Sequence, residues 1–199
     1  MDRRIQKSRQ AIMDALIELM AKKDFEKITI NEIADKANVN RGTIYLHYAD
    51  KYALLHECVE ISLTALDESC IPDPANPESA KESIIKTFQY MENHSFLYTT
   101  LLKGSGIPTF RNQLTKMMHQ KIELNIDMNG SHGDTPRDIL VHFFASAAAS
   151  LIEWWFMNGM PYSATEIAGH LWKLLERNQL VPEDSFSLWN TESSPIASR

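Results

Sequence analysis

The segment from residue 29 to residue 48 constrains the fold of this chain most, because it has the pattern of two short helices joined by a tight turn. Thr29-Ile30-Asn31-Glu32 matches a capping box, in which the hydroxyl and the carboxylate cap the start of a helix reciprocally. Asn38-Val39-Asn40 interrupts that helix, and Asn40 can cap a second helix that runs to about Tyr48. This pattern predicts a helix-turn-helix.

The rest of the chain also has helical periodicity. A first helix is expected before residue 23, and Asp50 can cap a helix from Lys51 to about Ser69. Later helices are expected over about 79–94, 109–128, 136–157 and 163–177, with Thr135 capping the third of these and Pro136 at its first position. No strand pattern and no internal repeat is visible, so we expect an all-α fold.

Three parts are expected along the chain. Residues 1–52 should form a three-helix DNA-binding domain, and a connecting helix should join it to a helical bundle over residues 53–180 for regulation and dimerisation. Residues 181–199 are polar and should form a flexible tail. Residues 1–51 hold 10 Lys and Arg against 8 Asp and Glu, whereas residues 52–199 hold 10 against 18. This uneven charge favours a DNA-facing head on an acidic body.

Composition argues against several other classes of protein. The most apolar stretch, residues 139–157, is interrupted by His142 and Glu153, so we expect no membrane span and no membrane partner. The N-terminus lacks the apolar core of a signal peptide. Cys58 and Cys70 are too few for a disulfide framework, which favours a cytoplasmic protein.

Motifs for catalysis are absent from the sequence. It contains no phosphate loop, no nucleophile motif and no glycine-rich cofactor turn. His94, His119 and His142 are scattered and do not form a metal-ligand pair. We therefore expect no enzyme activity, no cofactor and no metal.

The second helix of the pair carries side chains suited to a DNA groove. Its N-terminus would bring free amide groups and the positive dipole end to DNA. Arg41 can fork onto a guanine edge, and Gly42 lets the backbone approach closely. Ile44 and Tyr48 fall on the opposite face and should pack inward. Polar groups on the outer face can hydrogen-bond phosphates or base edges, and they belong to Thr43, Tyr45 and His47.

The runs 25–34 and 37–48, followed by Lys51, strongly resemble the DNA-binding domain of the TetR family of repressors. The resemblance covers roughly residues 5–60, and it implies that Thr29, Asn31, Arg41, Gly42, Thr43, Tyr45, His47 and Lys51 approach DNA. Asn40, which can cap the recognition helix, and Leu46 complete the set of candidate DNA-contacting residues. Relatives often have an aromatic where Leu46 stands, but Leu46 could still touch a thymine methyl group. Lys51 could reach a phosphate.

The C-terminal part resembles a domain of many TetR-like regulators at residues 110–114, 143–147 and 154–163. The helix over about 136–157 is apolar on nearly all sides, which favours either a homodimer or the central core helix of a monomer. We expect the homodimer, because helix-turn-helix proteins commonly bind two half-sites. Its candidate interface residues are Ala148, Ile152, Trp155, Ile167, Leu171 and Leu174.

Aromatic and Met side chains in the body suit either an effector pocket or plain core. The candidate pocket residues are Phe88, Met91, His94, Tyr98, Met117, Phe144 and Trp154. The expected function is a dimeric DNA-binding regulator, a repressor released from an inverted-repeat operator by an unknown small molecule. The alternatives are a DNA-binding dimer without an effector and an activator.

Overall fold

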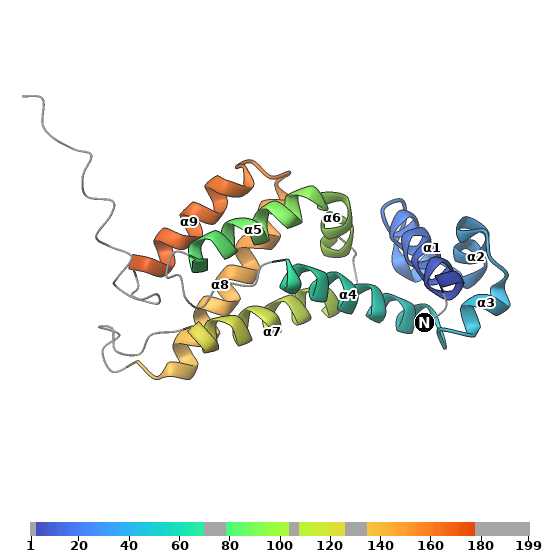
Figure 1. Ribbon diagram of the computed structural model, residues 1–199, viewed down its shortest axis with the longest axis horizontal. Coiled ribbons are helices and arrows are strands. Elements are labelled where there is room, and N and C mark those ends of the chain that lie inside the picture. The colour runs from blue at the N-terminus through green and yellow to red at the C-terminus, as the bar shows by residue number, and fades with distance from the viewer. Residues whose placement is uncertain (1–2, 70–78, 104–107, 126–134, 178–199) are drawn as a thin grey trace, which may run out of the picture.

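The computed structural model describes residues 3–69, 79–103, 108–125 and 135–177, and the regular elements in these ranges are all helices. A small head at one end of the molecule is joined to a larger body by one long helix (Figure 1). The predicted all-α architecture of a helix-turn-helix head and a helical body is therefore confirmed. The expected tail, residues 181–199, lies outside the described residues.

The head consists of α1 (Arg3–Met20), a short 3-10 turn η1 (Phe25–Lys27), α2 (Ile30–Ala37) and α3 (Arg41–Tyr45). Helix α1 packs against α2, and α2 packs against α3. Its core consists of side chains that are at most 3% exposed: Ile12, Ala15, Leu16, Phe25, Ile28, Ile33, Ala34, Ile44 and Tyr48. The inward positions of Ile44 and Tyr48 are as predicted from helical spacing.

Side-chain caps set where the helices of the head begin. The capping box at Thr29 is confirmed, because its hydroxyl accepts from the Glu32 amide while the Glu32 carboxylate accepts from the Thr29 amide at 2.9 Å. Asn40 Oδ1 accepts from the Gly42 amide at 2.8 Å. Asp50 accepts from two amides of the first turn of α4. The predicted caps at Thr29, Asn40 and Asp50 are therefore present.

Helix α4 (Lys51–Glu68) runs without a break from the head into the body. At the head its Glu57 carboxylate binds the guanidinium of Arg9 on α1 and accepts a hydrogen bond from Tyr48 Oη. Further along, α4 packs against α5 and α7. The domain boundary expected after residue 52 thus falls in the first turn of a continuous helix, and it stays a prediction.

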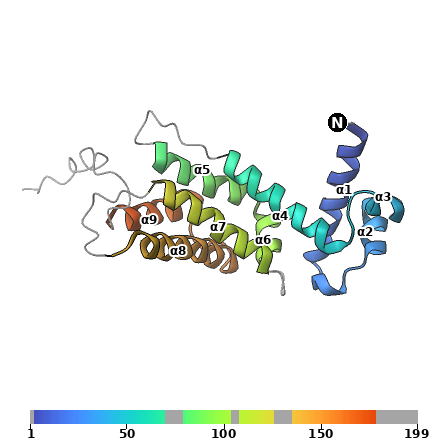
Figure 2. The same ribbon diagram turned by 90° about the horizontal axis from the view of Figure 1, so that it is seen from below.

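The body consists of α5 (Ser79–Asn93), α6 (Ser95–Lys103), α7 (Pro108–Asn125), α8 (Arg137–Met157) and α9 (Ala164–Arg177). Helix α5 packs along α9, as Figure 1 shows, and α7 packs along α8, as Figure 2 shows. Helix α6 lies between the head and the rest of the body, contacting both α1 and α8. Its position makes it, with α4, a second link between head and body.

Three local predictions differ from the structure. The recognition helix ends at Tyr45 instead of Tyr48, because the chain tightens into short-range turns in which His47 and Tyr48 both donate to the Ile44 carbonyl. Helix α6 was not predicted as a separate element. Pro136 precedes the first residue of α8 and makes no side-chain cap, so Thr135 is not the cap.

Helix α8 is long and apolar enough, by length and composition, to cross a membrane, contrary to the expectation from the sequence. The window that meets this test has a mean hydropathy of 1.5, and 44% of it is buried inside the molecule. The central core helix of a soluble bundle meets the same test. Helix α8 packs against α6 and α7, so one side of it belongs to the core of the body, and the absence of a membrane partner stays a prediction.

Candidate nucleic-acid interface

The outer face of α3 is open to solvent while its inner face is buried. Ile44 is fully buried, whereas Tyr45 is 46% exposed and Leu46 is 82% exposed. Arg41 and Gly42 are also exposed. A five-residue helix on its own is unstable in water, so α3 depends on the Asn40 cap and on the anchors Ile44 and Tyr48. The fold thus presents the predicted recognition residues from a fixed support.

Arg41 and Tyr45 form a pair one turn apart on the exposed face of α3. The guanidinium of Arg41 donates to Tyr45 Oη at 3.1 Å and lies 5.3 Å from the centre of the Tyr45 ring. Contacts at this spacing hold long side chains in a restricted set of conformations. The pair can therefore present a forked cation and an aromatic face together to a base edge or a phosphate.

Gly42 is not required by the packing of the protein itself. A Cβ atom added there would meet only Asn40 Oδ1, at 3.4 Å, which is an ordinary van der Waals distance. Its helical backbone has no positive φ to favour glycine. The missing side chain instead leaves the exposed backbone of α3 open to close approach from outside, as the sequence interpretation requires.

The remaining candidates surround this face with different degrees of exposure. Thr29, Asn31 and Asn40 are exposed, although Thr29 and Asn40 already act as helix caps. Thr43 and His47 are half-buried, and the His47 ring lies edge-on to Tyr48. DNA contact by each of them stays a prediction.

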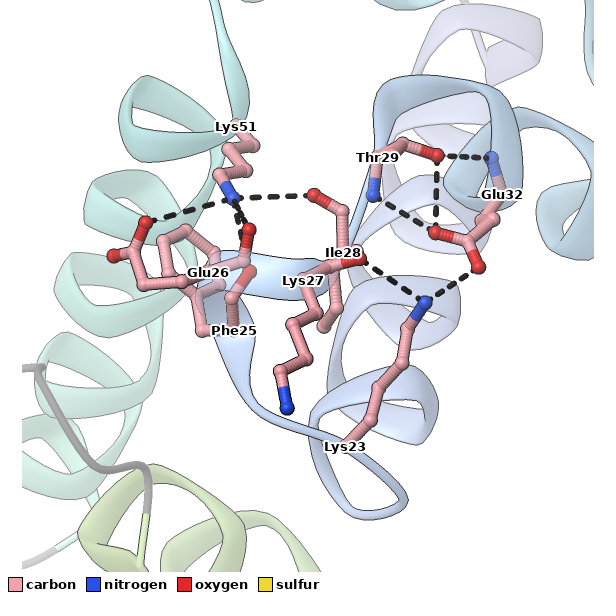
Figure 3. Close-up of polar contacts among 8 residues, drawn as sticks. All are labelled: Lys23, Phe25, Glu26, Lys27, Ile28, Thr29, Glu32 and Lys51. Carbon is pink, nitrogen blue, oxygen red and sulfur yellow. Dashed lines mark hydrogen bonds and ion pairs between the residues drawn. The ribbon is translucent and has the colours of Figure 1, made fainter.

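Lys51 has partners that the sequence did not suggest. Its side chain is only 15% exposed, and its ammonium donates to the carbonyls of Phe25, Glu26 and Ile28 at 3.0, 2.8 and 3.1 Å (Figure 3). Phe25 and Glu26 belong to η1, and Ile28 follows it just before α2 begins. Lys51 therefore fixes the start of α4 against the turn that leads into the helix-turn-helix. Its predicted phosphate contact stays a prediction, beside this structural role.

A second lysine stabilises the start of α2 from a different side (Figure 3). Lys23 Nζ lies 2.5 Å from a Glu32 oxygen and donates to the Lys27 carbonyl at 3.2 Å. The hydrogen bond from Lys23, with those from the amide and hydroxyl of Thr29, lowers the pKa of Glu32 to about 2. Glu32 is thus a charged capping residue at neutral pH.

The residues predicted to line an effector pocket lie partly in the core of the body and partly at its surface. Phe88, Met91 and Tyr98 are buried, and Phe144 is 9% exposed. Ring contacts occupy this region, with Phe88 against Trp155 and Tyr98 against Phe110 and Phe156. The other three candidates lie nearer the surface: His94 and Trp154 are exposed, and Met117 is half-buried. Their role in effector binding stays a prediction.

A cleft of about 590 Å³ lies elsewhere, between the head and α6. Its walls are the end of α1 and the turn into η1 on one side, and one face of α6 with Met160 on the other. The α6 residues of this cleft are not among the predicted site residues, because α6 was not expected as a separate helix. The signal was available in Phe96, Thr99 and Lys103, which recur at helical spacing before Gly104.

Four of the six predicted dimer residues are buried inside the protomer. Ala148, Ile152, Trp155 and Ile167 are at most 4% exposed, so in this structure they pack against their own chain. Leu171 is half-buried, and Leu174 is 52% exposed. The apolar side chains that α8 does expose are others: Ile139, Phe143, Trp154 and Met157. Because α8 is apolar all round, its sequence could not indicate which side faces outward.

No group of three or more His, Cys, Asp or Glu side chains that could hold a metal ion occurs in the ranges that the structure describes. Cys58, inside α4, is buried, and burial together with the nearby Glu57 and Asp14 raises the pKa of its thiol to about 12. Its chemistry is that of a small core side chain.

Comparison with known proteins supports the assignment of both regions. An uncharacterised HTH-type transcriptional regulator, YxbF of Bacillus subtilis, is 22% identical over 173 residues, which are 84% of this chain and 44% of the relative. A probable acrEF/envCD operon repressor of Escherichia coli is 31% identical over 132 residues, 61% of this chain and 51% of the relative. The chain thus spans about half the length of these relatives or less.

A solved structure and two family models complete the comparison. The TetR transcriptional regulator from Streptococcus agalactiae has the same fold, with a TM-score of 0.64 at 24% identity over 87% of this chain and 96% of that chain. The model for the C-terminal region of transcriptional regulators matches residues 78–177. The model for bacterial regulatory proteins of the tetR family matches residues 12–58. Because the two matches cover both the head and the body, the chain belongs to this family of transcriptional regulators and not to a family of enzymes.

Proposed function

We propose that this chain is a cytoplasmic, dimeric, sequence-specific DNA-binding repressor that a small molecule releases from an inverted-repeat operator. The observation that carries the DNA-binding part is the exposed outer face of α3, on which Arg41, Gly42 and Tyr45 face solvent while Ile44 anchors the helix from below. The match to the tetR family model covers α3, which supports the proposal that this face recognises DNA.

DNA binding can be tested on a site selected in vitro. A binding site is first isolated from a pool of random duplexes, and affinity for it is then measured for Arg41→Ala. If Arg41 reads a base edge, the variant should lose about 1–3 kcal/mol of specific binding. Arg137→Ala, an equivalent change at the exposed start of α8, is the control and should bind like wild type. Equal affinities of both variants, or failure to select any site, would contradict the proposal.

The dimer is supported by the row of apolar side chains that α8 leaves exposed. Phe143 is 64% exposed and Ile139 56% exposed, while Trp154 and Met157 lie on the same helical side further along. The small residues Ala147 and Ser150 stand between the two pairs. Large ends and a small centre allow a second helix to approach closely, and the same row on a partner is complementary under two-fold symmetry. We therefore propose this row, with Leu174, as the dimer surface.

Analytical ultracentrifugation measures the oligomeric state directly. Wild type should be a dimer at micromolar concentration, and Phe143→Glu should be a folded monomer because the charge would be buried in the interface. Leu124→Glu, at a residue that is 85% exposed on α7, is the matched control and should remain dimeric. A monomeric wild type on its selected DNA, or a dimeric Phe143→Glu, would count against the proposed surface.

Release by an effector is supported by the cleft between head and body, whose volume of about 590 Å³ is in the range of small-molecule sites. The alternatives are a DNA-binding dimer without an effector and an activator. Transcription in vitro from a promoter that carries the selected site separates repression from activation. A broad compound screen in which operator affinity never changes would favour the dimer without an effector.

A further inference from the structure

The cleft between the head and α6 has its own chemistry, distinct from that of the body core. One face of α6 lines it along its whole length, through Ser95, Phe96, Thr99, Thr100 and Lys103. The opposite wall belongs to the head: Met20, Ala21, Lys23, Asp24 and Phe25. Met160, from the loop between α8 and α9, closes one side. A molecule in this cleft would touch both domains at once.

Apolar surface makes up much of the lining. Phe96 is 58% exposed although it faces a concave site, and Met20 and Met160 are half-buried beside it. Phe25, which is almost fully buried, also belongs to the lining. Exposed aromatic and Met side chains around a hollow favour an apolar ligand body.

The charges of the lining leave one cation without a counter-charge. Lys23 is paired with Glu32 at 2.5 Å, and Asp24 lies 3.5 Å from Lys27 Nζ. Lys103, exposed in the last turn of α6, has no carboxylate within ion-pair distance among the residues that the structure describes. The hydroxyls of Ser95 and Thr99 lie on the same face and have no hydrogen-bond partner among those residues either. Together they suit an anionic group with several acceptor oxygens.

We propose that this cleft is the effector site, and that its ligand is a small apolar carboxylic acid whose carboxylate binds Lys103 and whose hydrocarbon lies against Phe96, Met20 and Met160. The proposal rests on the proposed function, because it assigns a place and a ligand class to the effector. The acid separates the end of α1 from α6 and so changes how the head is held on the body. Because α6 also packs against α8, the change reaches the dimer helix and the spacing of the two recognition helices. The acid lowers operator affinity.

Methionine methyl groups report directly on where an acid binds. The protein is labelled with ¹³C-methyl Met, and resonances are assigned with single Met→Leu variants. Octanoate, 4-phenylbutyrate and 1-naphthylacetate are titrated, with their primary amides as neutral counterparts. We expect saturable shifts of Met20 and Met160, which line the cleft, while Met91 and Met118 in the body core stay unchanged. The amides should bind more weakly.

Two variants test the assigned contacts. Lys103→Gln should weaken acid binding roughly fivefold, the effect of removing a partly exposed ion pair with its hydrogen bond. Phe96→Ala should weaken it as well. Lys116→Gln, on the exposed side of α7 and away from the cleft, is the control and should bind as wild type. The acid concentration that halves binding to the selected DNA should rise by the same factor in Lys103→Gln.

Several results would overturn the proposal. Shifts confined to Met91 and Met118 would place the effector in the body instead, and the absence of any saturable shift would leave the cleft without a ligand of this class. Equal affinity of Lys103→Gln and wild type would contradict the carboxylate contact. Binding in the cleft with unchanged DNA affinity would contradict its regulatory role. Failure of the ligand-free protein to bind any selected DNA would instead refute the proposed function, while the methyl titration would still test the site.

Discussion

The hydroxyl of Tyr98 on α6 donates a hydrogen bond to the main-chain carbonyl of Ser62 on α4, at 3.1 Å in the buried interior. Tyr98 lies on the side of α6 opposite the cleft, and α4 is the helix that begins at the head and continues into the body. One helix therefore has the cleft on its outer face and the connecting helix on its inner face. A displacement of α6 would act on α4 through this contact.

Tyr98→Phe should lower the free energy of unfolding by about 1 kcal/mol, because a buried hydrogen bond is lost without a change in ring packing. The variant should also respond less to a cleft-bound acid, since α6 would be less firmly tied to α4. Urea denaturation and DNA titrations in the presence of acid measure the two effects. Tyr90→Phe, at a half-buried ring stacked on His94, is the control and should change neither.

The head could be predicted almost completely from its sequence because its signals are local. The cap residues Thr29, Asn40 and Asp50 lie within three positions of the amides that they bind, so the pattern of residues specifies the contact. The inward positions of Ile44 and Tyr48 follow from helical spacing alone. What the local pattern did not specify was the end of α3, where the chain tightens before Asp50.

The body was predicted less well because its determinants are not local. The break between α5 and α6 has no Gly or Pro; the chain turns where the His94 ring contacts the Tyr90 carbonyl at 2.8 Å and stacks on the Tyr90 ring. An all-round apolar α8 gives no indication of its outward side, so Trp155 was expected at an interface and is fully buried. The cleft forms between segments that are about 75 residues apart in the sequence, such as Met20 and Phe96, and no periodicity can show it.

Lys51→Met should destabilise the head by about 1–3 kcal/mol, because three carbonyls at the end of η1 lose a charged donor. DNA binding should weaken for all sequences, because the turn that leads into the helix-turn-helix is held less firmly. Thermal denaturation and affinities at several salt concentrations measure both. Lys27→Met, at a 75% exposed side chain, is the control for stability. A salt slope reduced by about one would show that Lys51 also contacts a phosphate, as the sequence predicts, and an unchanged slope would leave it the structural role alone.

The capping box at α2 should show a measurable pH dependence. The pKa of Glu32, lowered to about 2, lies below its ordinary value of 4.5, so the stabilisation is fully present above pH 4.5 and is lost as the pH falls toward 2. Lys23→Gln removes the largest cause and should raise the pKa of Glu32, though not fully, because the Thr29 hydrogen bonds remain. An NMR titration of the side-chain carboxyl group measures the pKa of Glu32. Lys22→Gln should leave it unchanged, and an unshifted pKa in Lys23→Gln would show that Lys23 is not the cause.

Cys58 should be inert toward thiol reagents in the folded protein. With its pKa raised to about 12 by burial, its thiolate fraction at pH 8 is negligible, and the reagent cannot reach it. In Cys70→Ser, where Cys58 is the remaining thiol, a disulfide reagent at pH 8 should give no reaction in the native state and full reaction in guanidinium chloride. Native reaction at the rate of a free thiol would mean that α4 opens readily at this point.

Gly42→Ala separates the demands of folding from those of DNA binding. An added Cβ meets only Asn40 Oδ1, at 3.4 Å, so the fold accommodates it without a clash. Alanine is a better helix former than glycine, so the free energy of unfolding should stay the same or rise by about 0.5–1 kcal/mol. Affinity for the selected DNA should nevertheless fall at least tenfold, because the methyl group stands on the exposed backbone where a close approach is expected.

Asn31→Ala, at another exposed candidate in the head, gives the scale for loss of a single side-chain contact. Thermal denaturation and DNA titration are performed on the same preparations. A Gly42→Ala variant that binds DNA as tightly as wild type would mean that the backbone of α3 does not approach DNA closely. A variant that binds poorly because it is unfolded would contradict the packing argument, since nothing in the protein's own contacts requires glycine at this position.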